Sequence, residues 1–409
     1  MKFRWLPILL SSCLLLSGFG AFGESSDEWY DAMLRNAQLH LGNNRRLNRV
    51  IERAKNGEDI TIAVIGGSIT EGAGAKTYAE CYAKRILDGF RAAYGVGDGL
   101  HIGLVNAGVG GTASTFGWMR YERDVTGRVK DADGLPDIVI IEYAVNDGGE
   151  PTRHGCYESM VRSVLAQPNE PAVILLFSVF ETGYSLQNDF YPIGMKYDLT
   201  MVSMKNSAYP LVGKQWSKEA FFHDEYHPTS LGHKVYADCV LRAIADSSAQ
   251  EESASPQPVD VTPVYNANYM NLQRIFRDDY DESIALNVGS FREDDTSSYR
   301  NLPVGRVCGE NFYHLKNAGN EPLTFSCAFK NLLIAYKTSN SADFGTAEVY
   351  VDGVKTATLS AFSKTAWGQS EVRLVFSESE AKPHTVEIRM ADGSEQKLFT
   401  VTCLAYTPE

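Results

Sequence analysis

The feature that most constrains the fold is a change in the spacing of apolar residues near residue 250. Before it, five short apolar runs rich in β-branched residues alternate with longer segments in which apolar residues recur every three or four positions. Buried parallel strands separated by amphipathic helices produce this alternation, because the helices cover both faces of the sheet. The first half of the chain therefore predicts a three-layer α/β domain. The five predicted strands are Ile60–Ile65, Ile102–Asn106, Ile138–Tyr143, Val173–Phe177 and Leu199–Met204.

An amphipathic helix should precede the first of these strands. Its apolar stripe is spaced i, i+3, i+4 and i+7, with Asn44 as a candidate N-cap and Gly57 just past the end. The stripe consists of Leu47, Val50, Ile51 and Ala54.

The second half has a different period. Residues 247–262 are rich in Ser, Gln, Glu and Pro, a composition that cannot bury itself and predicts a linker. After it, apolar residues recur at every second position, with Asp352-Gly353 and Asp392-Gly393 as turns. We therefore expect residues 263–409 to form an all-β sandwich of jelly-roll type. Two alternating runs, Leu323-Phe325-Cys327-Phe329 and Phe399-Val401-Cys403, place both cysteines facing inward.

The first 23 residues have the form of a secretory signal peptide. Lys2 and Arg4 precede an apolar stretch, and Ala21-Phe22-Gly23 provides small residues for cleavage. This leaves residues 24–246 for the α/β domain and predicts a secreted or periplasmic protein. The segment ending at Cys13 also resembles a lipoprotein cleavage box, but the apolar run before it is short, so a surface lipoprotein is the less favoured alternative. No later stretch approaches the roughly 20 apolar residues that a membrane span requires.

Charge and cysteine content exclude several classes of partner. The chain has 38 Lys and Arg against 51 Asp and Glu, a net charge of -13, which would repel the phosphates of nucleic acids. Six cysteines follow the signal peptide, and we expect most of them to be buried free thiols. They form no Cys-x-x-Cys pair or Cys/His cluster that would indicate zinc.

Two glycine-rich segments follow the first two predicted strands, where sites form in open parallel sheets. Gly66-Gly67-Ser68 would let the chain turn sharply and expose the Ser68 hydroxyl, although a serine there could equally serve as an ordinary helix N-cap. The loop Asn106–Thr112 carries backbone amides that could face a phosphate or an oxyanion. Its dinucleotide-like pattern lacks the acidic residue expected about 20 positions later, where Arg128 stands, so we disfavour nucleotide binding.

Two further segments supply polar side chains. Asn146 follows the third strand, where its carboxamide could donate into the same site or simply form a turn. Asp224 and His227 lie three residues apart, so the carboxylate could fix the imidazole tautomer and leave the other ring nitrogen for a nucleophile. Of the eight histidines, His227 is the one we expect to be catalytic, whereas His223 and His233 should make local hydrogen bonds.

In order and approximate spacing, these four segments resemble the SGNH hydrolases, also called the GDSL esterase and lipase family. The resemblance implies a flavodoxin-like parallel sheet, with Ser68 as nucleophile, His227 as base and Asp224 as its orienting carboxylate. It also implies an oxyanion hole made by the amides of Ser68 and Gly111 and the side chain of Asn146. The implied acyl transfer needs no metal or other cofactor.

Two positions depart from the usual motifs of that family. Gly67 replaces the aspartate of Gly-Asp-Ser, and Gly-Gly-Ser-Ile-Thr resembles the variant found in carbohydrate esterases, which favours sugar esters over lipids. Ala144 replaces a glycine two residues before the asparagine, which bears on how tightly that loop turns.

The sequence thus predicts a secreted esterase that removes acyl groups, above all O-acetyl, from polysaccharides or oligosaccharides. Two alternatives remain open: a lipase, lysophospholipase or thioesterase acting on longer acyl chains, and a non-catalytic carbohydrate-binding surface protein. The expected sandwich resembles, in architecture only, the carbohydrate-binding modules of polysaccharide-degrading enzymes. Within it, Trp367 is a candidate for stacking on a sugar or closing over the active site, or else it plugs the sandwich edge.

Overall fold

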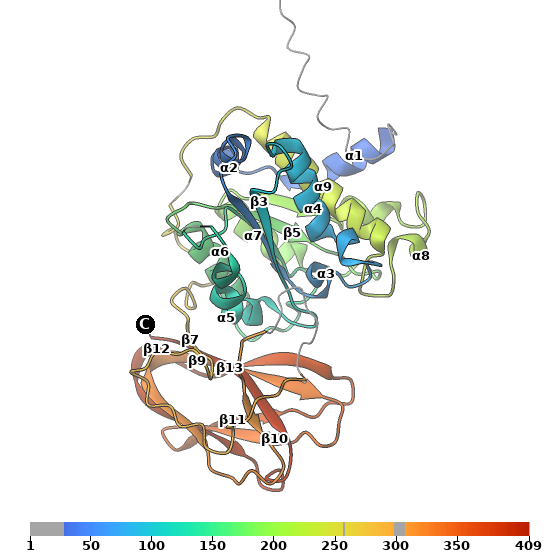
Figure 1. Ribbon diagram of the computed structural model, residues 1–409. Helices are drawn as coiled ribbons and strands as arrows, with labels where there is room; N and C mark the ends of the chain where they lie inside the picture. The colour runs from blue at the N-terminus through green and yellow to red at the C-terminus, as the bar shows by residue number, and fades with distance from the viewer. Residues whose placement is uncertain (1–27, 132, 257, 298–306, 409) are drawn as a thin grey trace, which may run out of the picture.

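The computed structural model describes residues 28–131, 133–256, 258–297 and 307–408. The predicted signal peptide and Cys13 lie outside these residues. The described chain forms an α/β part and, beneath it in Figure 1, an antiparallel β part. Within the described residues, no helix has the length and apolarity needed to cross a membrane.

The α/β part is built on a six-stranded sheet of order β1-β6-β5-β4-β2-β3. Strands β2 to β6 are parallel and have the first parallel strand in the interior, which is the predicted flavodoxin-like order. The edge strand β1 is antiparallel to β6 and was not predicted, because three residues of sequence Gln-Leu-His show no strand period. The strands are β1 (Gln38–His40), β2 (Ile60–Gly66), β3 (Ile102–Gly108), β4 (Ile138–Glu142), β5 (Ala172–Phe177) and β6 (Thr200–Ser203).

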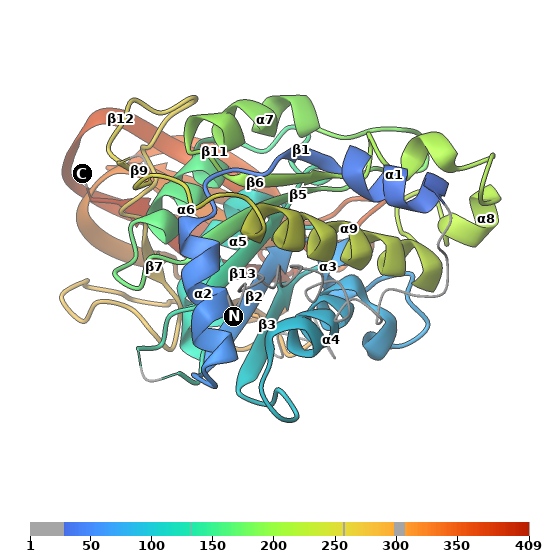
Figure 2. The ribbon, with the colours of Figure 1, turned by 90° about the horizontal axis from the view of Figure 1, so that it is seen from above.

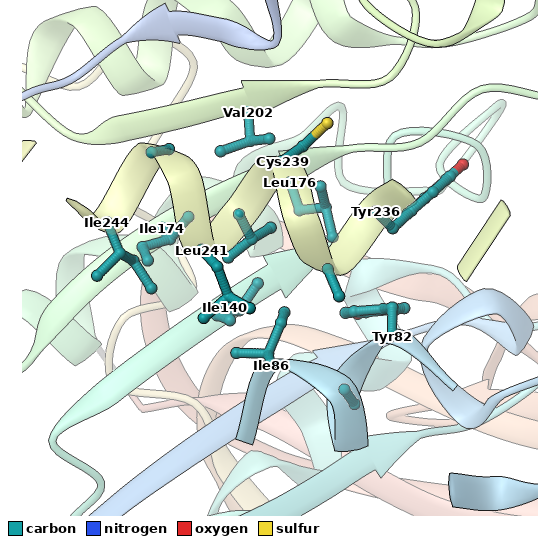
Figure 3. Close-up of a cluster of buried hydrophobic side chains, with 14 of the residues drawn as sticks. Tyr82, Ile86, Ile140, Ile174, Leu176, Val202, Tyr236, Cys239, Leu241 and Ile244 are labelled. Atoms are coloured by element: carbon teal, nitrogen blue, oxygen red, sulfur yellow. The ribbon is translucent and has the colours of Figure 1, made fainter. Parts of the chain in front are cut away.

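Helices cover both faces of this sheet, as the fully apolar strands require. One face packs against α1 (Glu28–Asn36), α2 (Arg45–Lys55), α4 (Tyr82–Tyr94) and α9 (Ser230–Ser248). Figure 3 shows the contact, in which Cys239 and Leu241 of α9 lie among Ile140, Ile174 and Val202 of the strands. The other face packs against α5 (Ser114–Asp124), α6 (Gly155–Leu165) and α7 (Gln187–Lys196). The view from above in Figure 2 shows α9 running across the sheet beside α1. The shorter helices are α3 (Ser68–Glu71), η1 (Tyr78–Glu80), η2 (Thr126–Arg128), η3 (Tyr209–Leu211) and α8 (Lys218–Phe221).

Buried polar side chains hold the segment after α9 against the α/β part. Asn44 occupies the N-cap position of α2, but its side chain makes no capping bond. It donates instead to the carbonyl of Ser247 in the last turn of α9, at 2.9 Å, and to that of Glu251 beyond the helix, at 3.2 Å. Further along, Glu158 accepts the backbone N–H groups of Val264 at 2.6 Å and Tyr265 at 2.7 Å. The segment therefore follows the surface of the α/β part. The boundaries of the expected domains and linker stay a prediction.

The β part is one antiparallel sheet of order β11-β10-β12-β9-β13-β7, with β8 also paired to β13. Its two longest strands, β9 and β12, pair along most of their length and bend where the register shifts, so the sheet folds over its own core as a sandwich. Asp352 and Gly353, both with positive φ, form the expected turn between β10 and β11. The predicted all-β sandwich is confirmed. Its strands are β7 (Gln273–Ile275), β8 (Phe312–His314), β9 (Leu323–Ser339), β10 (Thr346–Val351), β11 (Val354–Ser360), β12 (Trp367–Met390) and β13 (Phe399–Thr407).

The two parts share a hydrophobic core. The register of β13 shifts between Val401 and Cys403, so Val401 faces the sandwich interior whereas Cys403 packs with Phe116 and Met119 of α5. The expectation that Cys403 faces the sandwich interior was therefore wrong. At the same interface the indole N–H of Trp118 donates to the Tyr269 carbonyl at 2.6 Å. This shared core fixes the sandwich against helix α5 of the α/β part.

Candidate active site

Four loops meet at the carboxyl edge of the parallel sheet. Ser68 follows β2, Gly111 follows β3, Asn146 follows β4 and Phe180 follows β5. Because the strands are ordered β5-β4-β2-β3, these residues form a row in which Ser68 and Asn146 lie between Phe180 and Gly111. The row spans three strand spacings, or about 14 Å.

Glycines make the turn into Ser68 possible. A side chain on Gly66 would collide with Thr70 and with the Glu142 carbonyl, and a Cβ on Gly67 would lie 2.5 Å from Asn146 Oδ1. The absence of a side chain at Gly67 thus lets the Asn146 carboxamide approach the turn. Helix α3 begins at Ser68, so the Ser68 backbone N–H belongs to a first turn that lacks intrahelical acceptors.

A continuous chain of hydrogen bonds joins the three residues expected to carry catalysis. Ser68 Oγ lies 2.9 Å from His227 Nε2, and His227 Nδ1 lies 2.9 Å from both carboxylate oxygens of Asp224. The carboxylate can only accept, so Nδ1 carries the proton and Nε2 presents its lone pair to the Ser68 hydroxyl. This arrangement can deprotonate Ser68 during nucleophilic attack.

Backbone amides hold the Asp224 carboxylate in place. Its Oδ1 accepts the N–H groups of Tyr226 at 2.8 Å and His227 at 2.9 Å. Burial alone would raise the pKa of Asp224, but the hydrogen bonds from His227 and Tyr226 outweigh it and lower the pKa. The side chain of Asp224 is 44% exposed, against 22% for His227, so water screens part of their attraction.

The glycine loop after β3 borders the site, and one of its amides already has an acceptor. Gly110 N–H donates to Glu71 Oε2 at 2.8 Å, so this amide is occupied. Gly111 adopts a positive φ of 68° and is exposed beside Ser68 and Asn146, with which it lines one cleft. Glu71 was not anticipated, although its position three residues after Ser68 on α3 places it on the same side of the turn.

Two buried carboxyl groups brace these loops and were also not anticipated. Asp147 accepts the Ser114 N–H at 2.7 Å, which ties the Asn146 loop to the start of α5. Glu142 accepts the Thr70 hydroxyl at 2.9 Å, beneath the turn at Ser68. Burial raises the pKa of Asp147 to about 8 and that of Glu142 to about 7. Their sequence signal is weak, because acidic residues at strand ends are common in turns.

The histidine next to the site on α9 has a local structural role, as predicted. His233 Nδ1 accepts the Tyr82 N–H at 3.2 Å, and its Nε2 donates to the Ala73 carbonyl at 2.9 Å. Only the neutral ring can make both bonds. Burial lowers the pKa of His233 to about 4, in agreement with that geometry.

Ala144 causes no strain in the loop that leads to Asn146. It does not have a positive φ, it is fully buried, and its carbonyl accepts the Leu186 N–H at 2.7 Å. Glycine is therefore not required at this position of the chain.

The β part forms the second wall of a cleft of about 870 Å³ that contains Ser68, Asn146 and His227. Trp367, at the start of β12, is 61% exposed and lies over the glycine loop, since a Cβ on Gly111 would be 2.6 Å from Trp367 Cζ2. Trp367 therefore faces the cleft and does not plug the sandwich edge.

A paired lysine forms part of this second wall. Lys337 Nζ donates to Asp295 at 2.8 Å, which neutralises its charge, and to Ser297 at 2.7 Å.

In the part of the chain that the structure describes, no group of three or more His, Cys, Asp or Glu side chains could hold a metal ion.

Comparisons with known proteins agree with this geometry. Residues 64–235 match the GDSL-like Lipase/Acylhydrolase family. A crystal structure of a two-domain esterase (CEX) active on acetylated mannans superposes with a TM-score of 0.78 at 27% identity, over 92% of this chain and 98% of that one. The same esterase co-crystallized with mannopentaose gives a TM-score of 0.76 at 27% identity, with the same coverage. A search of curated proteins gives no significant match.

Proposed function

We propose that this chain removes O-acetyl groups from mannan-type polysaccharides or oligosaccharides. The premise is that it carries a GDSL-like lipase/acylhydrolase domain and is a carboxylic ester hydrolase of the carbohydrate-esterase kind. The observation that carries the proposal is the Ser68–His227–Asp224 hydrogen-bond chain, which opens into a cleft with walls from both parts of the molecule. The 27% identical two-domain esterase, which acts on acetylated mannans, supports the substrate class.

The proposed reaction begins with acylation of Ser68. His227 Nε2 takes the hydroxyl proton as Ser68 Oγ attacks the acetyl carbonyl, and Asp224 holds the resulting imidazolium in place. The negative oxygen of the tetrahedral intermediate faces the amides of Ser68 and Gly111 and the Asn146 side chain, each donor contributing roughly 3 to 4 kcal/mol. The C–O bond to the sugar then breaks as His227 protonates the leaving oxygen.

Deacylation repeats these steps with water. His227 removes a proton from the water molecule, hydroxide adds to the acetyl-serine, and the collapse of the second tetrahedral intermediate returns the proton to Ser68 Oγ. Acetate leaves, and the site is restored. The side chains named here suffice for each proton transfer.

The composition of the cleft supports a short acyl group on a polar carrier. Its lining combines aromatic rings with polar groups such as Glu71, Asn340 and Ser339, whereas a long acyl chain would favour a continuous apolar channel. We assign Trp367 to the wall that encloses the substrate, where an aromatic face stacks on the C–H groups of a sugar. The predicted signal peptide supports a secreted or periplasmic location, where such polymers are found.

The decisive experiment compares p-nitrophenyl acetate, butyrate and octanoate, together with acetate release from acetylated mannan and acetylated xylan, using Ser68→Ala as control. Preference for acetate with release from mannan supports the proposal. Preference for octanoate would replace it with a lipase or thioesterase. Absence of any Ser68-dependent hydrolysis, with intact polysaccharide binding, would indicate a binding protein.

A further inference from the structure

A cluster of aromatic side chains borders the cleft on the side away from Trp367. Phe180 packs edge-on against Tyr226 at 5.1 Å between ring centroids and stacks on Tyr184 at 5.8 Å. Tyr226 is 49% exposed and Tyr184 is 40% exposed, while Phe180 is partly buried between them. Phe180 and Tyr226 line the cleft, and Tyr184 extends the aromatic surface beyond it. So much exposed aromatic area beside a reactive serine is typical of a binding surface.

The cluster is anchored to the same loop that carries His227. Glu181 N–H donates to the Glu225 carbonyl at 3.0 Å, which joins the loop after β5 to the loop containing Asp224 and His227. Phe180 N–H donates to the Tyr184 carbonyl at 3.0 Å and closes a tight turn. The loops that carry the rings are therefore joined to the loop of His227 before any ligand binds, which reduces the entropy lost on binding.

The position of the rings beside His227 determines which part of an ester would meet them. Gly111 follows the edge strand β3, whereas Phe180 follows β5, on the far side of Ser68 and Asn146. The carbonyl oxygen must lie close to Ser68, between Gly111 and Asn146, to reach the proposed oxyanion donors. The leaving oxygen must lie within reach of His227 Nε2, and Tyr226 is the residue directly before His227.

We propose that Phe180, Tyr184 and Tyr226 form the subsite for the leaving alcohol, in which the pyranose ring that carries the ester stacks on the exposed tyrosines. The inference rests on the proposed function, because it requires a sugar as the leaving group. The inference gives the two groups of aromatic side chains different roles. Trp367 lies over the glycine loop after β3, and the cluster of Phe180, Tyr184 and Tyr226 receives the sugar next to His227.

The test measures competition by the reaction product. Hydrolysis of p-nitrophenyl acetate is followed while unacetylated mannopentaose is added as a competitive inhibitor, and the inhibition constant is determined for Tyr226→Ala, Tyr184→Ala and Tyr226→Phe. We expect the inhibition constant to rise about tenfold in Tyr226→Ala, severalfold in Tyr184→Ala and little in Tyr226→Phe, which retains the ring. The KM for acetylated manno-oligosaccharides should rise in the same order, with smaller changes in kcat.

Tyr191→Ala is the matched control, because Tyr191 is 39% exposed on α7 but does not line the cleft. Its inhibition constant should equal that of the wild type. Unchanged inhibition in both alanine variants of the cluster would overturn the subsite while leaving the esterase assignment intact. A shift in the ratio of acetate to butyrate hydrolysis, without a change in inhibition, would overturn it by placing the cluster on the acyl side. An active wild type that no oligosaccharide inhibits would overturn both the subsite and the proposed substrate class.

Discussion

The two walls of the cleft are built in different ways. On the α/β side, Ser68, Gly111 and Asn146 follow strands of the parallel sheet, and buried partners such as Glu142 and Asp147 hold these loops from below. Asp224 and His227 lie in the loop between α8 and α9. On the sandwich side, the cleft is lined by strand ends and turns, and its most prominent group, Trp367, is 61% exposed. From this difference we propose that the α/β wall performs the reaction and the sandwich wall encloses the substrate. Variants on each wall can test this division.

The largest expected effect comes from removing the nucleophile or the base. Ser68→Ala and His227→Ala should each lower kcat on the order of 10⁴ to 10⁶-fold for every ester tested, since the two residues act as a unit. The double variant should be no worse than either single variant. Near-native turnover of p-nitrophenyl acetate by either one would contradict the assignment.

The next effect concerns the oxyanion. Asn146→Ala should lower kcat on the order of 10² to 10³-fold with little change in KM, because the carboxamide would act on charge that develops only in the transition state. Asn340→Ala is the matched control, since Asn340 lines the same cleft from the sandwich wall. Equal losses in the two variants, measured with p-nitrophenyl acetate, would break the proposed division between the walls.

A smaller effect, dependent on the ester, is expected for Trp367. Trp367→Ala should raise KM for acetylated manno-oligosaccharides about tenfold, with a smaller effect on p-nitrophenyl acetate, because a stacked sugar would lose one aromatic face. Phe362→Ala serves as control, as Phe362 is 39% exposed on the β part but does not line the cleft. If KM and polysaccharide binding were both unchanged in Trp367→Ala, the residue would have no role in substrate binding.

Most of the α/β wall could be predicted from the sequence because three of its four segments directly follow a recognisable strand. The fourth, with Asp224 and His227, could be predicted only from the three-residue spacing of the two side chains. A run such as Ile138–Ile141 is apolar on both faces and therefore recognisable, and the polar residues that follow it have to lie at the carboxyl edge. By contrast, β1 contains only three residues, two of them polar, and carries no periodic signal.

The sandwich wall could not be predicted, because its position depends on contacts between the two parts. A single register shift in β13 turns Cys403 from the sandwich interior toward α5, and no local pattern marks such a shift. The position of Trp367 over Gly111 follows from that packing. Tyr226, in contrast, stands next to His227 in the sequence, and its proximity to the site could have been inferred.

The smallest expected effect is on stability, and its dependence on pH has opposite signs in the two parts. Burial raises the pKa of Asp147 to about 8, so the folded protein retains a proton that the unfolded chain loses above about pH 4. The stability that this protonated carboxyl group contributes is therefore lost as the pH rises toward 8. Burial would also raise the pKa of Asp295, but Lys337 and Ser297 outweigh it and lower the pKa, so its contribution is present above about pH 4 and is lost in acid. Thermal unfolding between pH 3 and pH 9 should therefore show a weaker decline toward alkaline pH for Asp147→Asn and a weaker decline toward acid for Asp295→Asn, each by a few degrees relative to the wild type. Parallel curves for both variants would show that neither carboxyl group governs the pH dependence of its part of the molecule.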